Sequence, residues 1–161
     1  MLIAVALGFL AVYLPIFWDH IPTLVMHKYY CEKEAGFWVY KTLDQWKTEN
    51  PGVMEVLVEE INAPFTRVGD DENHTDTKIL NQRFHWTNEK RHTVSFLPVY
   101  RWKFEMLDIE NGTVISRFVN FSSGEGRDYL KFWMNNESCN SSDSESIKSS
   151  EFTNQFKGAK K

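Results

Sequence analysis

The sequence predicts an α+β fold: an N-terminal transmembrane helix, followed by an antiparallel β-sheet of four to five strands packed against one main helix. Three observations predict it. Residues 1–18 contain no charged side chain. Residues 51–62 place apolar side chains along one side of a helix. Residues 100–106 alternate apolar and charged side chains with a period of two, as a half-buried strand does.

The uncharged N-terminal segment approaches the length of about 20 residues that a helix needs to cross a bilayer. Tyr13 and Trp18 have the amphipathic rings that favour a membrane–water interface. No basic residue precedes the segment, and no small-x-small cleavage site follows it. The pattern therefore favours an uncleaved anchor over two alternatives, which are a cleaved signal peptide and the buried helix of a soluble protein.

The two cysteines, Cys31 and Cys139, stand far apart in the chain. An even count in an anchored domain favours one long-range disulfide and an oxidising compartment, whereas the alternative is two unrelated buried thiols. The positive-inside rule taken alone would leave the body in the cytoplasm, because Lys28 and Lys33 follow the apolar segment. Adjacent glutamates offset these lysines. We therefore expect the exported orientation for the body of the protein.

The composition divides the chain into three parts. We expect residues 1–26 to form the membrane anchor and an interfacial segment, and residues 27–139 to form the α+β domain. Residues 140–161 are rich in Ser, Asn, Glu and Lys, and this composition predicts a disordered tail because it offers little apolar surface to bury. The formal net charge is −4 and no basic cluster occurs, so no nucleic-acid partner is expected.

Two start signals predict helices in the first half of the domain. Thr42 opens a capping-box pattern, which predicts a short helical turn. Asn50-Pro51 then precedes apolar residues at four-residue spacing and predicts the main helix over residues 51–62. Residues 66–81 are polar and predict a loop. Acidic residues crowd this loop, but they do not match the EF-hand pattern, so we expect a solvated loop and no metal.

The second half of the domain predicts strands. Residues 84–87 and 94–96 alternate apolar and polar side chains, with a polar turn expected at residues 88–91 between them. The strand over residues 100–106 leads to Asn111-Gly112, the preferred centre of a two-residue type I′ hairpin turn.

A two-residue hairpin loop fixes the expected strand register. Glu110 would pair with Thr113, and Phe104 would face Val119, which aligns the apolar sides of the two strands. After this hairpin, a glycine turn and a short helix over residues 127–134 are expected. The helix over residues 51–62 would cover the apolar face of the sheet.

Catalytic signatures are absent from the sequence: it has no H-E-x-x-H, no G-x-S-x-G and no complete phosphate loop. His85 and His92 could approach each other across the expected turn, with an acid from residues 70–76. Two function classes follow. The first is a non-enzymatic, membrane-anchored envelope protein with a binding, accessory or immunity role and a protein partner. The alternative is a small envelope hydrolase that uses His85 or His92. No cofactor is expected.

One resemblance adds to these patterns. The segment Cys31-Glu-Lys-Glu-Ala-Gly36, followed by Val39-Tyr40, resembles small uncharacterised bacterial membrane-anchored envelope proteins at the point just after their N-terminal span. The segment Val119-Asn-Phe-Ser-Ser-Gly124 is similar to a second region of the same proteins. The resemblance covers a small part of the chain and implies no activity. It implies a bacterial source, an uncleaved anchor and an exported body, and so an inner-membrane protein whose body faces the periplasm.

Overall fold

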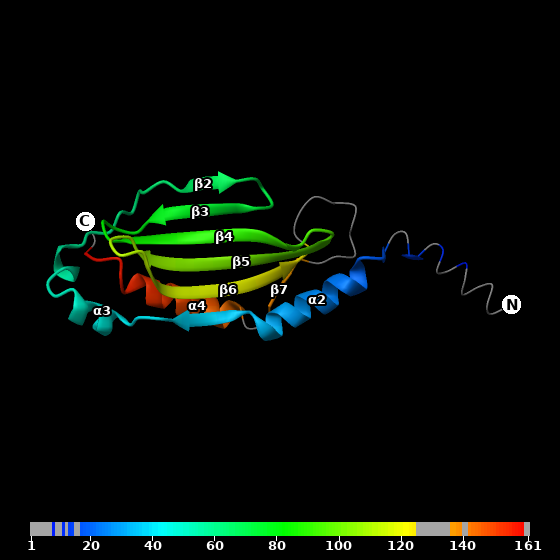
Figure 1. Cartoon of the computed structure of the whole chain (residues 1–161), viewed down its shortest axis with the longest axis horizontal. Helices are drawn as coiled ribbons and strands as arrows, with labels where there is room; N and C mark the ends of the chain where they lie inside the picture. Colours follow the sequence, from blue (N-terminus) through cyan, green and yellow to red (C-terminus); the bar gives the residue numbers. More distant parts are fainter. Residues whose placement is uncertain are drawn as a thin grey trace.

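The computed structural model describes residues 8, 11, 13–14, 17–124, 136–139 and 142–159. Three helices, a short 3₁₀ turn and seven strands follow one another along this part of the chain (Figure 1). In chain order they are α2 (His20–Lys33), β1 (Gly36–Val39), α3 (Leu43–Glu49), the 3₁₀ turn (Met54–Val56), β2 (Thr66–Gly69), β3 (His74–Ile79), β4 (Phe84–Val94), β5 (Leu97–Asp108), β6 (Thr113–Ser123), β7 (Glu137–Ser138) and α4 (Ser142–Asn154).

All seven strands form one antiparallel sheet in the order β1-β6-β5-β4-β3-β2, and β7 pairs with the end of β6 beyond β1. The prediction of an α+β fold with an antiparallel sheet is confirmed. The sheet is larger than the expected four to five strands, because residues 66–81 add two strands at one edge. Helix α4 lies behind the sheet in Figure 1, and α2 packs at the end of β5 and β6.

The prediction of a loop over residues 66–81 is wrong, because β2 and β3 form a hairpin there. Gly69 adopts a φ of +119°, and a Cβ atom at this position would lie 2.1 Å from the carbonyl oxygen of Asn73, so the close approach requires glycine. The Asp70 carboxylate accepts hydrogen bonds from the backbone of Glu72 and Asn73 and closes the turn. β2 exposes all four of its residues, and β3 buries the polar side chains His74 and Asp76. The hydrophobic alternation that signals a strand is therefore missing.

The prediction of a turn at residues 88–91 is also wrong. These residues continue β4, which runs unbroken from Phe84 to Val94 and pairs with β5 along its length. Polar β4 side chains lie beside aromatic partners on β5, such as Asn88 opposite Phe104. The sequence pattern lost its alternation here because this part of the strand exposes polar side chains on both faces of the sheet.

The hairpin at Asn111-Gly112 is confirmed, but its expected register is not. The ladder closes at Asp108 opposite Thr113, so the loop has four residues instead of two. A bulge on β6 then shifts the pairing by one residue, and Phe104 faces Phe118 instead of Val119. Val119 consequently lies on the opposite face of the sheet, where it stays buried at 8% exposure in a cluster that includes Tyr30 of α2.

The main helix expected over residues 51–62 does not form. Gly52 adopts a φ of +77°, only residues 54–56 form a 3₁₀ turn, and Leu57 is already extended. Leu57 enters the core from this irregular segment at 5% exposure. The segment is fixed instead by a short parallel bridge between Val58 and Ala159.

The prediction of a disordered tail over residues 140–161 is wrong for its described part, because α4 occupies the place expected for the main helix. Phe156 is fully buried just after α4 and packs against Trp46 and Phe84, and Phe152 packs at the margin of the same core. Two phenylalanines four residues apart are enough to dock a Ser-rich helix onto the sheet. The described residues up to 159 therefore belong to the domain.

The predicted transmembrane helix falls largely on residues that the structure does not describe. Within the described residues, no helix has both the length and the apolar character needed to cross a membrane. The helix expected over residues 127–134 likewise lies outside the described residues.

Candidate functional site

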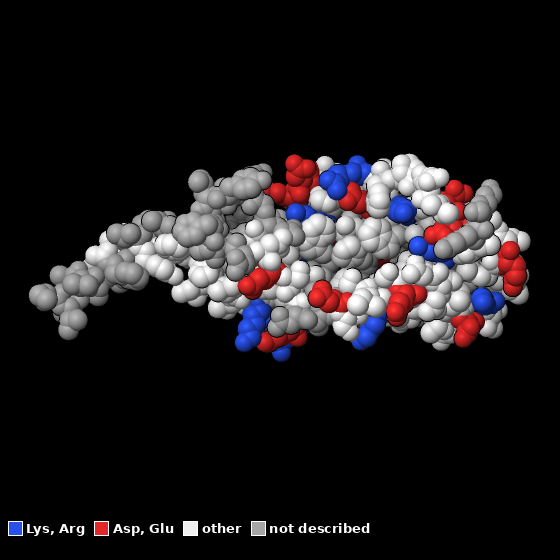
Figure 2. All heavy atoms as spheres, turned by 180° about the vertical axis from the view of Figure 1, so that it is seen from behind, with Lys and Arg blue, Asp and Glu red and all other residues white. Residues whose placement is uncertain are grey.

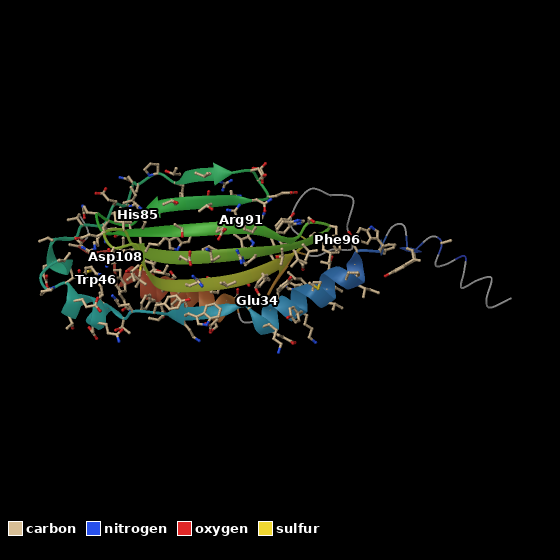
Figure 3. All side chains as sticks on the ribbon, in the orientation of Figure 1. Glu34, Trp46, His85, Arg91, Phe96 and Asp108 are labelled. Carbon is tan, nitrogen blue, oxygen red and sulfur yellow. A yellow bond between two sulfur atoms is a disulfide. The ribbon has the colours of Figure 1, made fainter. Side chains whose placement is uncertain are left out.

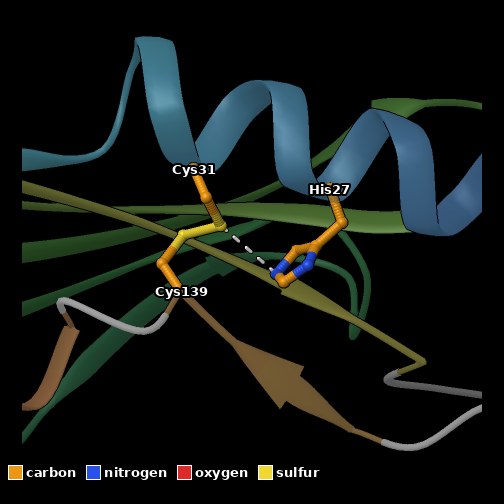
Figure 4. Close-up of side chains that lie close together, drawn as sticks. All are labelled: His27, Cys31 and Cys139. Carbon is orange, nitrogen blue, oxygen red and sulfur yellow. Dashed lines mark hydrogen bonds between the residues drawn. A yellow bond between two sulfur atoms is a disulfide. The ribbon is translucent and has the colours of Figure 1, made fainter.

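The two cysteines form a disulfide that ties α2 to the segment after β7. Cys31 and Cys139 are 108 residues apart in the chain, and their Cα atoms lie 5.4 Å apart (Figure 4). Cys139 is buried at 4% exposure, and Cys31 is half-buried. The disulfide predicted from the even cysteine count is present, which excludes the alternative of two free thiols.

His27 lies beside this disulfide for a structural reason. β6 pairs with β1 up to Val119 and with β7 from Ser122, so the carbonyl of Phe121 faces a gap between the two partner strands. His27 Nε2 lies 3.2 Å from that carbonyl oxygen and 3.4 Å from Cys31 Sγ. A protonated Nε2 donates to the carbonyl and satisfies an acceptor that the sheet leaves open.

His27, Cys31 and Cys139 also bring three potential metal-ligand atoms within 4.8 Å of one another. Zinc binds cysteine as the thiolate. In the disulfide both sulfurs are consumed by the S–S bond. This cluster therefore stabilises the fold and does not form a metal centre in the oxidised protein.

The histidines expected to support catalysis lie apart. His85 and His92 are both on β4, and an odd separation of seven residues places them on opposite faces of the sheet, about 23 Å apart. The backbone N–H of His92 donates to the Asn73 side chain, and His85 lies opposite Leu107 (Figure 3).

The acidic residues of segment 70–76 have other roles. Asp76 is buried at 9% exposure and forms a two-point ion pair with Arg67, at 2.7 and 2.8 Å. This hydrogen-bonded guanidinium holds the pKa of Asp76 below its ordinary value of 3.8. His74, from the same polar segment, approaches Asp76 at 3.7 Å. The structure therefore joins Asp76 to Arg67 and His74 and not to the predicted histidines.

The two faces of the sheet differ strongly in chemistry. We call one the aromatic face because Trp86, Trp102, Phe104 and Phe118 point to it from three adjacent strands. We call the other the charged face, where ion pairs connect the side chains Glu89, Arg91, Arg101, Lys103, Glu105 and Arg117.

On the charged face, Glu89 and Lys103 are 2.8 Å apart at the centre of the network. Burial favours the neutral form of Glu89, but hydrogen bonds from Lys103 and Arg91 outweigh this effect and lower the pKa of Glu89 below 4.5. Burial likewise opposes the charge on Lys103, and hydrogen bonds to Glu89 and Glu105 raise its pKa above 10.5. A face whose charges satisfy one another in this way offers few unsatisfied groups to a ligand.

The aromatic face is open along part of its length. A groove of about 310 Å³ runs between α4 and the sheet, with Trp86, Phe104 and Phe118 on its floor and Phe65 at one margin. The helix side of the groove presents hydroxyl groups from Ser146, Ser149, Ser150 and Thr153. Figure 2 shows this face from behind, with Asp, Glu, Lys and Arg at its margins and few charges across its middle.

The groove continues past Phe104 and Phe118 into a second hollow of about 260 Å³. Its floor adds Trp102, which lies nearly parallel to Phe104 at 6.4 Å between ring centroids, and Phe104 lies 5.5 Å from Phe118. The side-chain oxygen of Asn120 in this hollow is buried without a hydrogen-bond partner. Among the described residues, this continuous strip of aromatic rings is the surface best suited to hold a ligand.

The sequence analysis missed this groove. It did identify Trp102 and Phe104 as one side of a strand, but the expected register placed the wrong residues of β6 beside them. The other wall comes from α4, which the composition had predicted to be disordered. The signal that could have revealed it is the pair Phe152 and Phe156 at helical spacing.

The two residues expected at the membrane interface are both placed by the structure. Tyr13 stacks on Phe17 with ring centroids 5.0 Å apart. Trp18 is 49% exposed and stacks against Phe96 of the β4–β5 turn at 6.5 Å. Both therefore lie at the α2 end of the molecule.

No family model, curated protein or solved structure matches this chain.

Proposed function

We propose that this chain is a non-enzymatic binding module of a bacterial cell envelope, with an accessory or immunity-type role, and that its ligand is a polypeptide segment of a partner protein. The observation that carries the proposal is the groove over Trp86, Phe104 and Phe118. Exposed apolar hollows of this kind occur where a protein receives a ligand or partner.

The lining of the groove favours a polypeptide with apolar side chains. The aromatic floor offers a flat apolar surface, on which side chains of a partner would bury area worth about 25 cal/mol per Å². The opposite wall offers hydroxyl groups of Ser146 and Ser149, which can bond the partner's peptide groups. Lys78 stands at the margin and favours a segment with an acidic residue beside the apolar ones, whereas Lys157 is already paired with Glu59 at 3.1 Å.

The proposed cellular location of the module rests on its uncharged N-terminal residues and on its disulfide. The uncharged residues 1–18 support attachment to the inner membrane, and the Cys31–Cys139 disulfide supports a body that faces the periplasm. The resemblance of residues 31–36 to bacterial envelope proteins supports the same location.

We do not propose the hydrolase alternative. A general base and an acid must lie within hydrogen-bond reach of each other or of one substrate. His85 and His92 are separated by the sheet and by about 23 Å. The Asp76 carboxylate is held by Arg67 instead.

Photo-crosslinking in cells tests the groove as a binding site. A photoreactive phenylalanine analogue replaces Phe65 in the groove margin, and in a second protein it replaces Arg91 on the charged face. We expect a discrete adduct from position 65 and none from position 91. The adduct should be digested by a protease and resist glycosidases, because the proposed ligand is a polypeptide.

A blocking variant makes this test specific. Ser146→Trp fills the groove and should abolish the adduct, whereas Ser144→Trp adds the same bulk elsewhere on α4 and should leave it intact. Both variants should keep the thermal unfolding midpoint of the parent, since Ser144 and Ser146 are exposed. An adduct that survives Ser146→Trp, or equal adducts from positions 65 and 91, would contradict the proposal.

A further inference from the structure

Helix α2 has an inverted distribution of polar and apolar side chains. Its buried side carries Asp19 at its start, then Thr23 and His27, which are 0%, 2% and 8% exposed. These three residues are four positions apart and therefore lie on one side of the helix. A helix on the surface of a water-soluble domain normally buries its apolar side instead.

The outward side of the same helix is apolar over its first turns. Leu14, Trp18, Ile21 and Val25 are 53%, 49%, 59% and 61% exposed. Ile21 and Val25 lie on the side of α2 opposite Thr23 and His27, whereas Leu14 and Trp18 precede the helix. Exposing these apolar side chains to water is unfavourable, because removal of apolar surface from water lowers the free energy.

The outward side of α2 becomes more polar after Val25. The next outward positions are Lys28, Tyr29 and Glu32. Lys28 and Glu32 form an exposed ion pair one helical turn apart, at 3.9 Å. Their side chains are 78% and 61% exposed. A change from apolar to charged residues along one side of a helix marks the level at which the environment changes from apolar to aqueous.

A second element adds to this apolar surface. Phe96, in the turn between β4 and β5, is 65% exposed and stacks against Trp18. Figure 3 shows Phe96 at the end of the sheet next to the start of α2. The apolar surface therefore belongs to the folded body as well as to the helix, and it lies at the end of the molecule where α2 begins.

We propose that this surface, formed by Leu14, Trp18, Ile21, Val25 and Phe96, lies in the interface of a lipid bilayer. The proposal rests on the membrane attachment under the proposed function and adds to it a contact made by the β4–β5 turn. Continuity with the uncharged segment argues for lipid, and so does Trp18, whose ring suits the headgroup region. The contact fixes the body upright, with α3 at the end far from the membrane.

Spin-label accessibility tests this contact in the full chain. Single cysteines replace Val25, Phe96, Glu32 or Val56, and a nitroxide is attached without reductant so that the native disulfide stays closed. The protein is reconstituted in vesicles of phosphatidylethanolamine and phosphatidylglycerol. We expect labels at positions 25 and 96 to be relaxed severalfold more by oxygen, which concentrates in lipid, than by a water-soluble nickel chelate. Labels at positions 32 and 56 should show the reverse.

A label at position 14 distinguishes membrane attachment of the chain from the lipid contact of the folded body. If it responds to oxygen while labels at positions 25 and 96 respond to nickel, the body contact is overturned and membrane attachment stands. If all labels respond to nickel, the attachment itself fails. Spin–spin broadening at position 25 that disappears on dilution with unlabelled protein would assign the surface to a second copy of the chain and overturn the lipid contact.

Discussion

At the scale of single residues, Asp108 has the most demanding environment. It is fully buried at the end of β5, where Arg83 donates to it at 2.5 Å and Trp46 Nε1 donates at 2.8 Å. Figure 3 shows Trp46 and Asp108 at the α3 end of the sheet. A buried carboxylate is tolerated when its oxygens are this fully paired.

The first prediction concerns this carboxylate. Asp108→Asn leaves the Arg83 guanidinium, which is 11% exposed, without its buried anionic partner. We expect the free energy of unfolding to fall by about 3–5 kcal/mol, which is typical of breaking a buried ion pair. Urea denaturation followed by circular dichroism measures this change.

Glu110 provides the matched control for Asp108, because it also pairs with Arg83 but its side chain is 69% exposed. Glu110→Gln should change stability by less than about 1 kcal/mol. Equal effects of the two substitutions would show that burial does not set the strength of the Asp108 interaction.

A second residue-scale prediction concerns pH. The folded pKa of Glu89 lies below its ordinary value of 4.5, so the unfolded chain binds this proton more tightly. The stabilisation is therefore complete above pH 4.5 and is lost as the pH falls through the folded pKa. Glu89→Gln should lower stability by about 1 kcal/mol at pH 7. The difference between the two proteins should shrink steadily below pH 4.5. A difference that stays constant down to pH 3 would contradict this assignment.

At the scale of elements, sequence patterns predicted a structure correctly where interactions between neighbouring residues determine that structure. The capping box of α3 forms as expected, with Thr42 and Gln45 bonded in both directions. The Asn111-Gly112 turn also forms, with Gly112 at a φ of +67°. Its register could not be predicted, because a bulge and two extra loop residues depend on packing that the turn sequence does not encode.

Elements that depend on distant partners were not predictable from the local sequence. The segment 51–62 has helical spacing, but it gives way to an irregular path because α4 fills the site over the core. α4 is anchored by the half-buried Phe152 and by the buried Phe156 just after the helix, and the rest of its composition resembles that of a disordered tail. The groove could not be predicted for two reasons. One of its walls is α4, which the composition predicted to be disordered, and its floor depends on the register of β6, which the turn sequence did not determine.

The third prediction tests how α4 is held. Phe156 is fully buried between Trp46 and Phe84. Phe156→Ala should lower the free energy of unfolding by about 3–5 kcal/mol through lost contacts and the cavity that remains. Ile147→Ala, on the same helix but 59% exposed, should stay within about 0.5 kcal/mol of the parent. Denaturant unfolding of both variants provides the comparison. If residues 142–159 contributed nothing to the core, both substitutions would have equal, negligible effects on the free energy of unfolding.

At the scale of the whole molecule, the disulfide joins α2 to the segment between β7 and α4. It closes a loop of 108 residues between Cys31 and Cys139. The fourth prediction is that the double substitution Cys31→Ser and Cys139→Ser lowers stability by about 4–5 kcal/mol, as the chain-entropy account expects for a loop of this length. Reduction of the disulfide in the parent protein should cause the same loss of stability, and calorimetry measures it. A reduced parent that unfolds at the same temperature would contradict it.

The central claim is that the body stands on the outer side of the inner membrane. Val56 is 73% exposed in the irregular segment after α3, away from α2 and from the groove. Val56→Cys, treated with a membrane-impermeant maleimide, tests this directly. We predict labelling in cells whose inner membrane is intact, with Cys31 and Cys139 unreactive until they are reduced. Labelling of position 56 only after the inner membrane is permeabilised would contradict the claim.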